Sequence, residues 1–423
     1  MSKELKALEK TNGTNVGEKK KVKKKKACKY WQYRDFDDVG LYIGKTGKLY
    51  GSEAKKLKNI YCQVYSTENL VRSAWKAQKG KGRRTEIENF NDEICENLSD
   101  LWEMLYYQTY SPGEYRLKEI LDPKKRIISI APFYPDRIIH HCIINVLSQH
   151  WTSLFIANTY ACIEGRGTHQ CMMDVHKALI EDKQGTLYCL KIDIRKYFDS
   201  VDHRAMKRIV RYTIADEQML WLIDTIIDSN GKDKGLPIGN YTSQYLANLY
   251  LAYFDHWVKE DLGIKYYYRY MDDMVVLAED KTTLHCVLNM FALYLGSELK
   301  LEIKDNWQIF PVDDRGIDFC GFRQNHHGIM LRKSILMKFY KKYRNMIDDL
   351  PQIKTEEDIK HLFPSEYGWI IRCDAVHSTW IFNKLIQDGN KHFINRTDSS
   401  RKACQNRRSP QRTGNCVVQS QHG

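Results

Sequence analysis

The amino-acid sequence predicts an α+β fold, and three patterns carry that prediction. Apolar residues recur at steps of three and four from Ile87 to Leu105, which is typical of an amphipathic helix. Residues 187–194 (LYCLKIDI) alternate between apolar and polar side chains, which favours a strand. Residues 266–277 (YYYRYMDDMVVL) indicate two short strands joined at Met271. Helices therefore accompany a sheet.

The other elements are expected in a definite order along the chain. A hairpin is expected at residues 39–51, helices over 67–108, and extended segments at 115–120 and 126–130. Further helices are expected from Pro135 to about His150, from Asp202 onward, and over residues 243–262, 283–297 and 330–395. A basic break, Lys79-Gly80-Lys81-Gly82-Arg83-Arg84, interrupts the first helical region.

Composition and charge exclude several classes of protein. A chain of 423 residues with 43% hydrophobic and 12% aromatic residues is not wholly disordered. No apolar run is long enough for a membrane span, and no apolar stretch follows the N-terminal lysines as in a secretory signal. Most of the net charge of +13 lies in residues 1–26 and 396–423. Such tails suit phosphate backbones, although a solubilising tail is the alternative.

Three elements carry the predicted chemistry. Asp193 lies on a strand whose other face is apolar, Asp272 and Asp273 lie at the turn of a hairpin, and a Gly-rich loop (residues 235–244) lies between them in sequence. Carboxylates on buried strands cost free energy unless cations compensate them. Two ions held together would stabilise a nucleotidyl transfer. An acidic pair in a turn is often only turn chemistry, and successive strand side chains face opposite ways, so we expect Asp193 and Asp272 to be the firm ligands.

Four stretches in sequence order resemble the successive palm motifs of reverse transcriptases: LKIDIRKYFDSVDH, GLPIGNYTSQYLANLYL, YYRYMDDMVVLAED and IDFCGF. Upstream, DPKKRIISIAPFYPDRIIHHCI and NTYACIEGRGTHQ resemble the fingers motifs of the group II intron-like bacterial branch. The resemblance implies a right-hand polymerase with interleaved fingers, a palm of antiparallel sheet backed by helices, and a helical thumb. The implied bounds are 1–66 for a basic, partly disordered extension, 67–190 for fingers, 191–325 for palm, 326–395 for thumb and 396–423 for a basic disordered tail.

The resemblance also implies roles for individual residues. Two Mg²⁺ ions, with Mn²⁺ as a substitute, would be held by Asp193, Asp272, Asp273 and the Ile194 carbonyl. Lys304 matches a lysine proposed to act on the leaving pyrophosphate, and an exposed strand-end lysine is the alternative. The nucleotide-binding candidates are Arg126, Lys125, Ile194, Tyr197, Ile238, Gly239 and Gln244. Tyr197 falls at the aromatic steric gate, with a core aromatic as the alternative, and the primer grip comprises Phe319, Cys320, Gly321 and Phe322.

The loop departs from the commoner family pattern in a specific way. Ile238-Gly239 stands where many reverse transcriptases have Gln-Gly, and Ser243-Gln244 where they have Ser-Pro, and this form resembles the enzymes of diversity-generating retroelements. These copy a template-repeat RNA with errors at adenines to diversify a target gene. An apolar Ile238 lacks the hydrogen bonds of an amide, each worth about 1 kcal/mol, so discrimination would fall.

This subtype implies partners and a location. The partners would be template RNA and its cDNA duplex, deoxynucleoside triphosphates and an accessory variability protein forming a basic ring, without a membrane. The expected location is the cytoplasm of a bacterium, or of a bacterial host for a phage protein. One alternative is a retron-like, abortive-infection or group II intron-type reverse transcriptase. Another is a catalytically idle RNA-binding protein with a polymerase fold.

Overall fold

The computed structural model describes residues 56–121, 125–347 and 350–406, with side chains as far as residue 395. The expected hairpin at residues 39–51, most of the N-terminal extension and the last residues of the C-terminal tail lie outside this part of the chain. No helix among the described residues is both long enough and apolar enough to cross a membrane.

The first described elements are helices: α1 (Tyr61–Val64), α2 (Thr67–Gln78), α3 (Thr85–Asp92) and α4 (Ile94–Tyr106). The predicted apolar stripe is divided between α3 and α4, because the backbone of Glu93 leaves helical geometry (φ −122°, ψ 43°). Leu101 and Leu105 are fully buried, in keeping with the stripe, whereas Ile94 is 38% exposed. The break turns the start of α4 away from the core.

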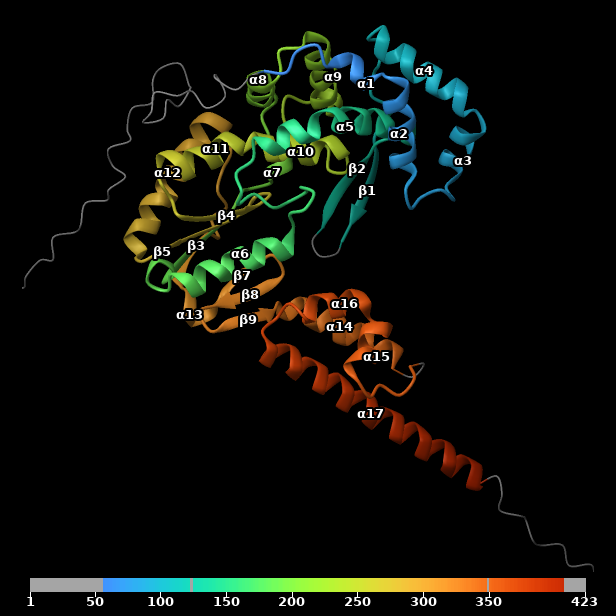
Figure 1. Ribbon diagram of the computed structural model, residues 1–423, viewed down its shortest axis with the longest axis vertical. Coiled ribbons are helices and arrows are strands. Elements are labelled where there is room, and N and C mark those ends of the chain that lie inside the picture. The colour runs from blue at the N-terminus through green and yellow to red at the C-terminus, as the bar shows by residue number, and fades with distance from the viewer. Residues whose placement is uncertain (1–55, 122–124, 348–349, 407–423) are drawn as a thin grey trace, which may run out of the picture. The chain divides into compact units, whose positions relative to one another are not determined.

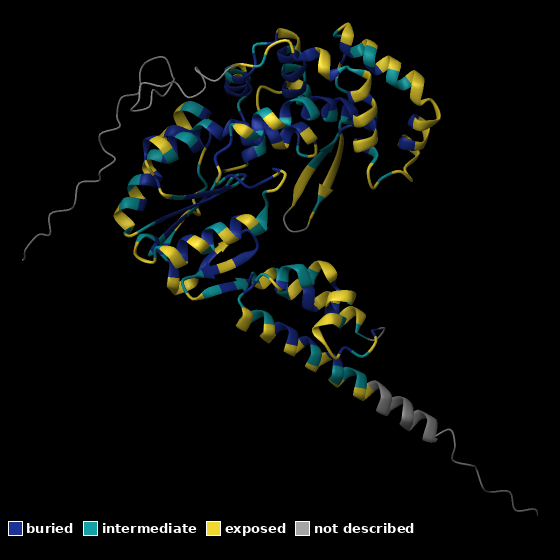
Figure 2. Cartoon of the chain, in the orientation of Figure 1, coloured by how far each residue is buried: buried dark blue, intermediate teal, exposed yellow. Residues whose placement is uncertain are grey.

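An antiparallel hairpin follows, formed by β1 (Arg116–Ile120) and β2 (Arg126–Ile130). Both strands lie where extended segments are predicted, and Figure 2 shows that they are largely exposed. An irregular turn over Phe133–Arg137, in which Tyr134 has an extended backbone (φ −110°, ψ 133°), leads into α5 (Ile138–Ser153), which is buried along most of its length and packs against α2.

The central sheet is four-stranded and antiparallel, in the order β4-β5-β3-β6. Its strands are β3 (Tyr188–Asp193), β4 (Tyr266–Tyr270), β5 (Asp273–Ala278) and β6 (Gln308–Pro311). Helix α6 (Thr168–Glu181) packs on the face that carries Cys189 and Val275, and α12 (Lys281–Leu299) contributes Phe291 to the opposite face, against Tyr267. Figure 1 shows the sheet between these two helices. Burial on both faces fixes the register.

Helices of the central region lie between β3 and β4 in sequence: α7 (Tyr197–Ser200), α8 (His203–Thr213), α9 (Glu217–Ile227), α10 (Tyr241–Tyr250) and α11 (Ala252–His256). The side chain of Asp202 accepts from the Ala205 amide at 2.8 Å, so it caps α8 at the predicted start. The single helix expected over residues 243–262 is instead three consecutive segments: α10, α11 and a π-helical turn over Trp257–Asp261.

The remaining elements are a short helix α13 (Val312–Arg315), a three-stranded sheet and C-terminal helices. The sheet comprises β7 (Ile317–Phe319), β8 (Phe322–Asn325) and β9 (Gly328–Leu331), and the helices are α14 (Lys333–Met346), α15 (Glu356–Leu362), α16 (Pro364–Ile370) and α17 (Ala375–Asn406). Because β9 reaches Leu331, the helical region begins slightly later than predicted. Because α17 continues to Asn406, the expectation of an unfolded tail from residue 396 is wrong for its first part.

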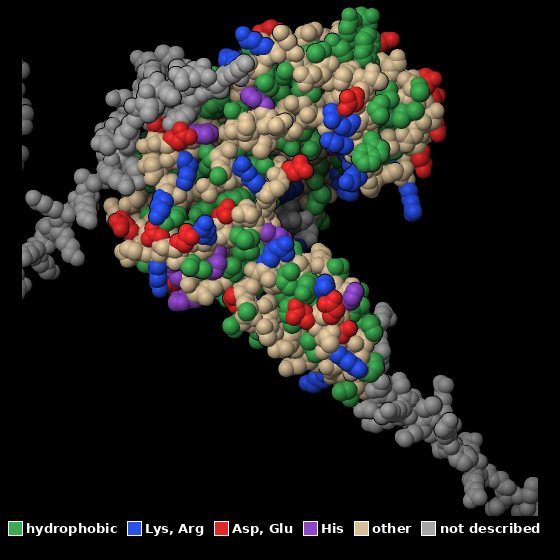
Figure 3. Space-filling view, viewed as in Figure 1, with side chains coloured by type: hydrophobic (Ala, Val, Ile, Leu, Met, Phe, Trp, Pro, Cys, Tyr) green, Lys and Arg blue, Asp and Glu red, His purple; other side chains and the backbone are tan. Residues whose placement is uncertain are grey.

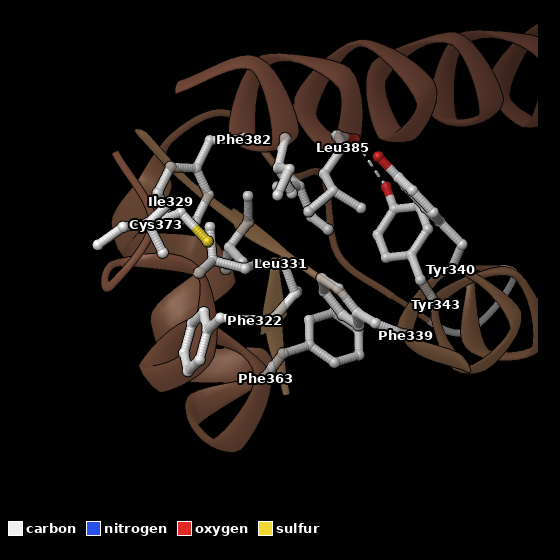
Figure 4. Packing of buried hydrophobic residues seen from close by; sticks show 14 of the residues in the cluster. Phe322, Ile329, Leu331, Phe339, Tyr340, Tyr343, Phe363, Cys373, Phe382 and Leu385 are labelled. Carbon is white, nitrogen blue, oxygen red and sulfur yellow. Dashed lines mark hydrogen bonds between the residues drawn. The ribbon is translucent and has the colours of Figure 1, made fainter. Parts of the chain in front are cut away.

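The C-terminal helices share one apolar core, drawn in Figure 4. Phe339 and Tyr343 of α14 pack against Phe363, and Leu385 of α17 completes this side. The Tyr343 hydroxyl donates to the Leu385 carbonyl at 2.8 Å. Phe322 of β8 belongs to the same core, which joins the small sheet to these helices. Helices backing antiparallel sheet confirm the α+β prediction.

Candidate active site

Strand pairing in the central sheet brings the predicted carboxylates together. Asp193, the last residue of β3, pairs directly with Asp273, the first residue of β5. Asp272 lies in the turn between β4 and β5, immediately after Met271, whose φ of 56° is left-handed. That turn bends the chain enough for Asp272 and Asp193 to interact through their side chains. Residues from two distant stretches therefore meet at one end of the sheet.

The carboxylates are desolvated and crowd one another. Burial, and next the neighbouring Asp193, raise the pKa of Asp272 to about 6. Burial also raises the pKa of Asp273 to about 6, although the ammonium of Lys191 opposes the shift. One oxygen of Asp193 and one of Asp273 are buried without a hydrogen-bond partner. Hard cations prefer such oxygens, so this donor set fits Mg²⁺.

Two lysines lie against these carboxylates. Lys304 Nζ is 2.5 Å from Asp193 Oδ2, and the Lys304 amide donates to the Asp193 carbonyl at 2.9 Å. Lys191 Nζ is 3.4 Å from Asp273 Oδ2 and also donates to the Asp318 carbonyl. Within the described ranges, no three His, Cys, Asp or Glu side chains already stand in ligating positions around one point. The lysines supply positive charge beside the carboxylates. Lys191 was not among the predicted site residues, although it shares a strand face with Asp193.

A buried ion pair supports the hairpin that carries Asp272. Arg269 of β4 and Asp255 of α11 are both fully buried, and Arg269 NH2 lies 2.5 Å from Asp255 Oδ2. Arg269 NH1 also donates to the carbonyl of Met271 at 2.9 Å, which ties the left-handed turn to α11. The Tyr267 hydroxyl donates to Asp255 at 2.6 Å. Sequence analysis missed this pair, and only the unusual Arg in an apolar strand could have signalled it.

The structure contradicts the assignment of Tyr197 as the steric gate. Its ring is 2% exposed, and its hydroxyl donates to the Ala247 carbonyl at 2.5 Å, so Tyr197 is a core aromatic. Burial raises its pKa well above the usual value. Lys196, with a left-handed φ of 44°, precedes the first residue of α7, Tyr197. The adjacent Phe198 is half-buried, and it is the better candidate.

The Gly-rich loop packs against the β1–β2 hairpin. The Ser129 amide of β2 donates to the Ile238 carbonyl at 2.8 Å. Gly239 has φ 122°, and a Cβ there would lie 2.7 Å from the Ser129 carbonyl oxygen, so a side chain would force the two segments apart. Ile238 is half-buried, whereas Gln244 is exposed on α10. Ile238 and Gly239 thus stand at a contact between hairpin and loop.

The other predicted residues lie in three places: on the β1–β2 hairpin, at the β7–β8 turn and beside Asp193. Arg126 begins β2 and is exposed, while Lys125 pairs with Glu119 at 2.5 Å on the same hairpin. Phe319 and Phe322 pair across the β7–β8 turn and are fully buried. Cys320 and Gly321 form the turn itself, with φ of 51° and 89°. Ile194 is buried and pairs with Ile303, beside Asp193.

The family model for reverse transcriptase (RNA-dependent DNA polymerase) matches residues 119–323, which contain the carboxylates, the Gly-rich loop and the β7–β8 turn. Residues 119–323, just under half of the chain, therefore resemble a reverse transcriptase domain, the domain of RNA-directed DNA polymerases. The antiparallel sheet backed by helices agrees with the α+β fold that the sequence predicts. This match does not distinguish the diversity-generating subtype from other reverse transcriptases.

Individual proteins that are similar to this chain match only part of it. Protein YkfC of Escherichia coli (strain K12) is 27% identical over 139 residues, 30% of this chain and 36% of that protein. Nuclear intron maturase 1, mitochondrial, of Arabidopsis thaliana is 23% identical over 125 residues, 26% of this chain and 17% of that protein. The chain therefore spans little more than a third of these relatives at most. The apo telomerase of Candida Tropicalis aligns at 11% identity with a TM-score of 0.42, over 71% of this chain and 63% of that one.

Proposed function

We propose that the chain copies RNA into DNA by two-metal nucleotidyl transfer. The observation that carries this proposal is the meeting of Asp193, Asp272 and Asp273 at the end of the central sheet, inside a reverse transcriptase domain. Buried carboxylate oxygens without partners suit two Mg²⁺ ions, or Mn²⁺ in their place. When bound, such ions stabilise the attacking and leaving oxygens of the transfer.

The chain's own residues would bind and select the nucleotide. Arg126, exposed on β2, offers several donors in a plane for the triphosphate oxygens. Lys304 lies within 2.5 Å of Asp193, where it would meet the leaving pyrophosphate. Phe198, rather than Tyr197, would close the space that a ribose 2′-hydroxyl needs. The Phe319–Phe322 turn would hold the primer end.

Primer extension with purified protein tests this proposal. A defined RNA template, a DNA primer, deoxynucleotides and Mg²⁺ should give full-length DNA with the wild-type chain. Asp272→Asn keeps the size of the side chain but removes its charge, so extension should fall by at least about a thousandfold, or about 4 kcal/mol in the barrier. Equal extension by the wild-type chain and Asp272→Asn would contradict the proposal and favour a catalytically idle RNA-binding protein.

We further propose the diversity-generating subtype, which makes cDNA with errors at template adenines. Support comes from Ile238, whose half-buried apolar side chain stands at the contact between loop and hairpin and cannot donate a hydrogen bond. Template-repeat RNA and an accessory variability protein forming a basic ring would be the partners. Ile238→Gln should lower misincorporation opposite adenine, whereas Ile238→Leu should leave it high.

A group II intron-type, retron-like or abortive-infection enzyme is the second candidate. The partial match to an intron maturase favours the intron type. Sequencing of the extension products separates the candidates. Errors gathered at adenines would support the diversity-generating subtype, and a faithful product from the wild-type chain would support the second candidate.

A further inference from the structure

A groove lies between α14, α17 and the β8–β9 hairpin, away from the catalytic carboxylates in sequence. It has a volume of about 450 Å³. We define the α14–α17 groove by its lining side chains: Arg323, Met330, Leu331, Lys333, Leu336, Met337, Tyr340, Arg344, His377, Trp380 and Lys384. None of these residues has a part in the proposed chemistry of the active site.

Aromatic rings and apolar side chains line this groove, and two of them remain open to solvent. Trp380 is 50% exposed and Met337 is 55% exposed. The His377 ring stacks on Trp380, with centroids 5.8 Å apart and planes 17° apart. Lys384 Nζ lies 5.1 Å from the Tyr340 ring and 5.2 Å from the Trp380 ring. An aromatic ring that enters the groove could therefore stack on an aromatic side chain.

The charges of the groove all have one sign. Among the described residues that line it, the charged side chains are Arg323, Lys333, Arg344 and Lys384. These four cations outnumber the acidic groups nearby, Asp388 beside Tyr340 and Asp374 beside His377, so the groove favours an anion. Figure 3 shows a mixture of acidic and basic side chains on the visible face, against which a wholly cationic lining is unusual.

Two polar atoms of the groove are buried and lack a partner: the Tyr340 hydroxyl and His377 Nε2. Tyr340 is only 7% exposed, so water reaches it poorly. A buried polar atom without a hydrogen bond costs free energy that a ligand can recover. Figure 4 shows Tyr340 and Tyr343 side by side beneath α17, and the bond from Tyr343 to Leu385 holds the two helices together. The groove is thus preformed.

We propose that the α14–α17 groove binds single-stranded RNA, with a base against Trp380 and backbone phosphates beside Lys384, Arg344 and Lys333. Stacking platforms flanked by cations are how proteins hold single strands. A duplex fits less well, because its bases are already stacked on one another. The inference rests on the proposed function, since RNA is then the template and part of it would occupy the groove during copying.

Binding of a fluorescent oligouridine to the full-length chain, followed by anisotropy at several salt concentrations, tests the proposal. Trp380→Ala should weaken binding about tenfold, because stacking of one base is worth about 1–3 kcal/mol. Lys384→Gln should lower the slope of log affinity against log salt by about one. Val376→Ala is the matched control, because Val376 lies on the same helix, is 83% exposed and does not line the groove.

The outcomes separate the groove from the active site. Extension of a short primer–template should be unchanged in Val376→Ala, and the melting temperature of Trp380→Ala confirms that this variant folds. If the wild-type chain fails to extend primers but oligouridine binding still depends on Trp380, the proposed function falls and the groove assignment stands. Equal binding by wild type and Trp380→Ala would overturn the assignment. So would an acidic, Tyr-containing peptide that binds the groove more tightly than oligouridine, which would make the groove a protein-docking surface.

Discussion

Strands β3 and β1 are both predicted from the sequence, yet they differ in what surrounds them. In β3 the apolar residues are buried between α6 and α12, and the only polar side chains, Lys191 and Asp193, lie at the site. In β1 nearly every residue is exposed. Figure 2 shows the contrast between the dark central sheet and the bright hairpin. Packing on both faces of the sheet therefore fixes the carboxylates, whereas the cations of the hairpin lie on its exposed surface.

Removing the buried ion pair should have the largest effect on the central sheet. Arg269→Ala leaves Asp255 charged and buried without its partner, and breaking such a pair costs about 3–5 kcal/mol of stability. Urea denaturation followed by circular dichroism measures this loss. Arg211→Ala removes an exposed partner of Asp224 and should cost less than about 1 kcal/mol. Equal losses in the two variants would show that the buried pair does not support the hairpin.

A matched pair of isoleucines sharpens the comparison of the two regions. Ile192 in β3 is 1% exposed, and Ile127 in β2 is 58% exposed. Ile192→Ala should cost about 2–5 kcal/mol, since it removes buried methyl groups and leaves a cavity. Ile127→Ala should cost less than about 0.5 kcal/mol. Equal denaturation midpoints for the two variants would contradict the expectation that the central sheet depends on buried side chains and the hairpin does not.

Substitutions of the cations on the β1–β2 hairpin should change the kinetics of primer extension rather than the free energy of unfolding. Arg126→Gln should raise KM for deoxynucleotides about tenfold, because a hydrogen bond to a charged group is worth about 1.5 kcal/mol. Lys125→Gln should raise it less, because Lys125 already pairs with Glu119. Steady-state primer extension measures both values. A larger rise in KM for Lys125→Gln than for Arg126→Gln would make Lys125, rather than Arg126, the main contact of the triphosphate.

The smallest expected effect is the pH dependence of the Mg²⁺ requirement. The pKa values of Asp272 and Asp273 are both about 6, so protons compete with the metal as the pH falls. From about pH 8 to about pH 6 the Mg²⁺ concentration for half-maximal extension should rise about fourfold, as two half-protonated carboxylates predict. A requirement that falls over this range would contradict the raised pKa values.

The sequence predicts those parts of the molecule in which local patterns decide the structure. The alternation in β3, the turn at Met271 and the bounds of β2 follow from neighbouring residues, and the structure places them as expected. The break at Glu93 and the extension of α17 to Asn406 do not follow, because no glycine or proline marks them. Tyr197 is assigned as the steric gate from its place in the motif alone, and the motif does not show the burial that makes it a core aromatic.

Contacts between distant residues account for most of the candidate site that the sequence did not predict. Arg269 finds its partner in α11, and Lys191 reaches the carbonyl of Asp318 in β7. Neither pairing has a sequence spacing that identifies it. The predicted carboxylates were found because their residue types stand out on apolar strands. Their supporting residues become visible only when the strands are paired.

Phe322 belongs to the three-stranded sheet and also packs in the core of the C-terminal helices. Its ring lies 5.2 Å from Trp369 of α16, and a Cβ at Gly321 would lie 2.6 Å from the same indole. The predicted boundary between palm and thumb, residue 325, therefore passes beside a shared aromatic contact. A shortened chain that stops at residue 325 would expose this ring to water. Exchange of the C-terminal helices for those of a similar chain would likewise keep this ring covered only if the incoming segment carried an aromatic ring in the place of Trp369.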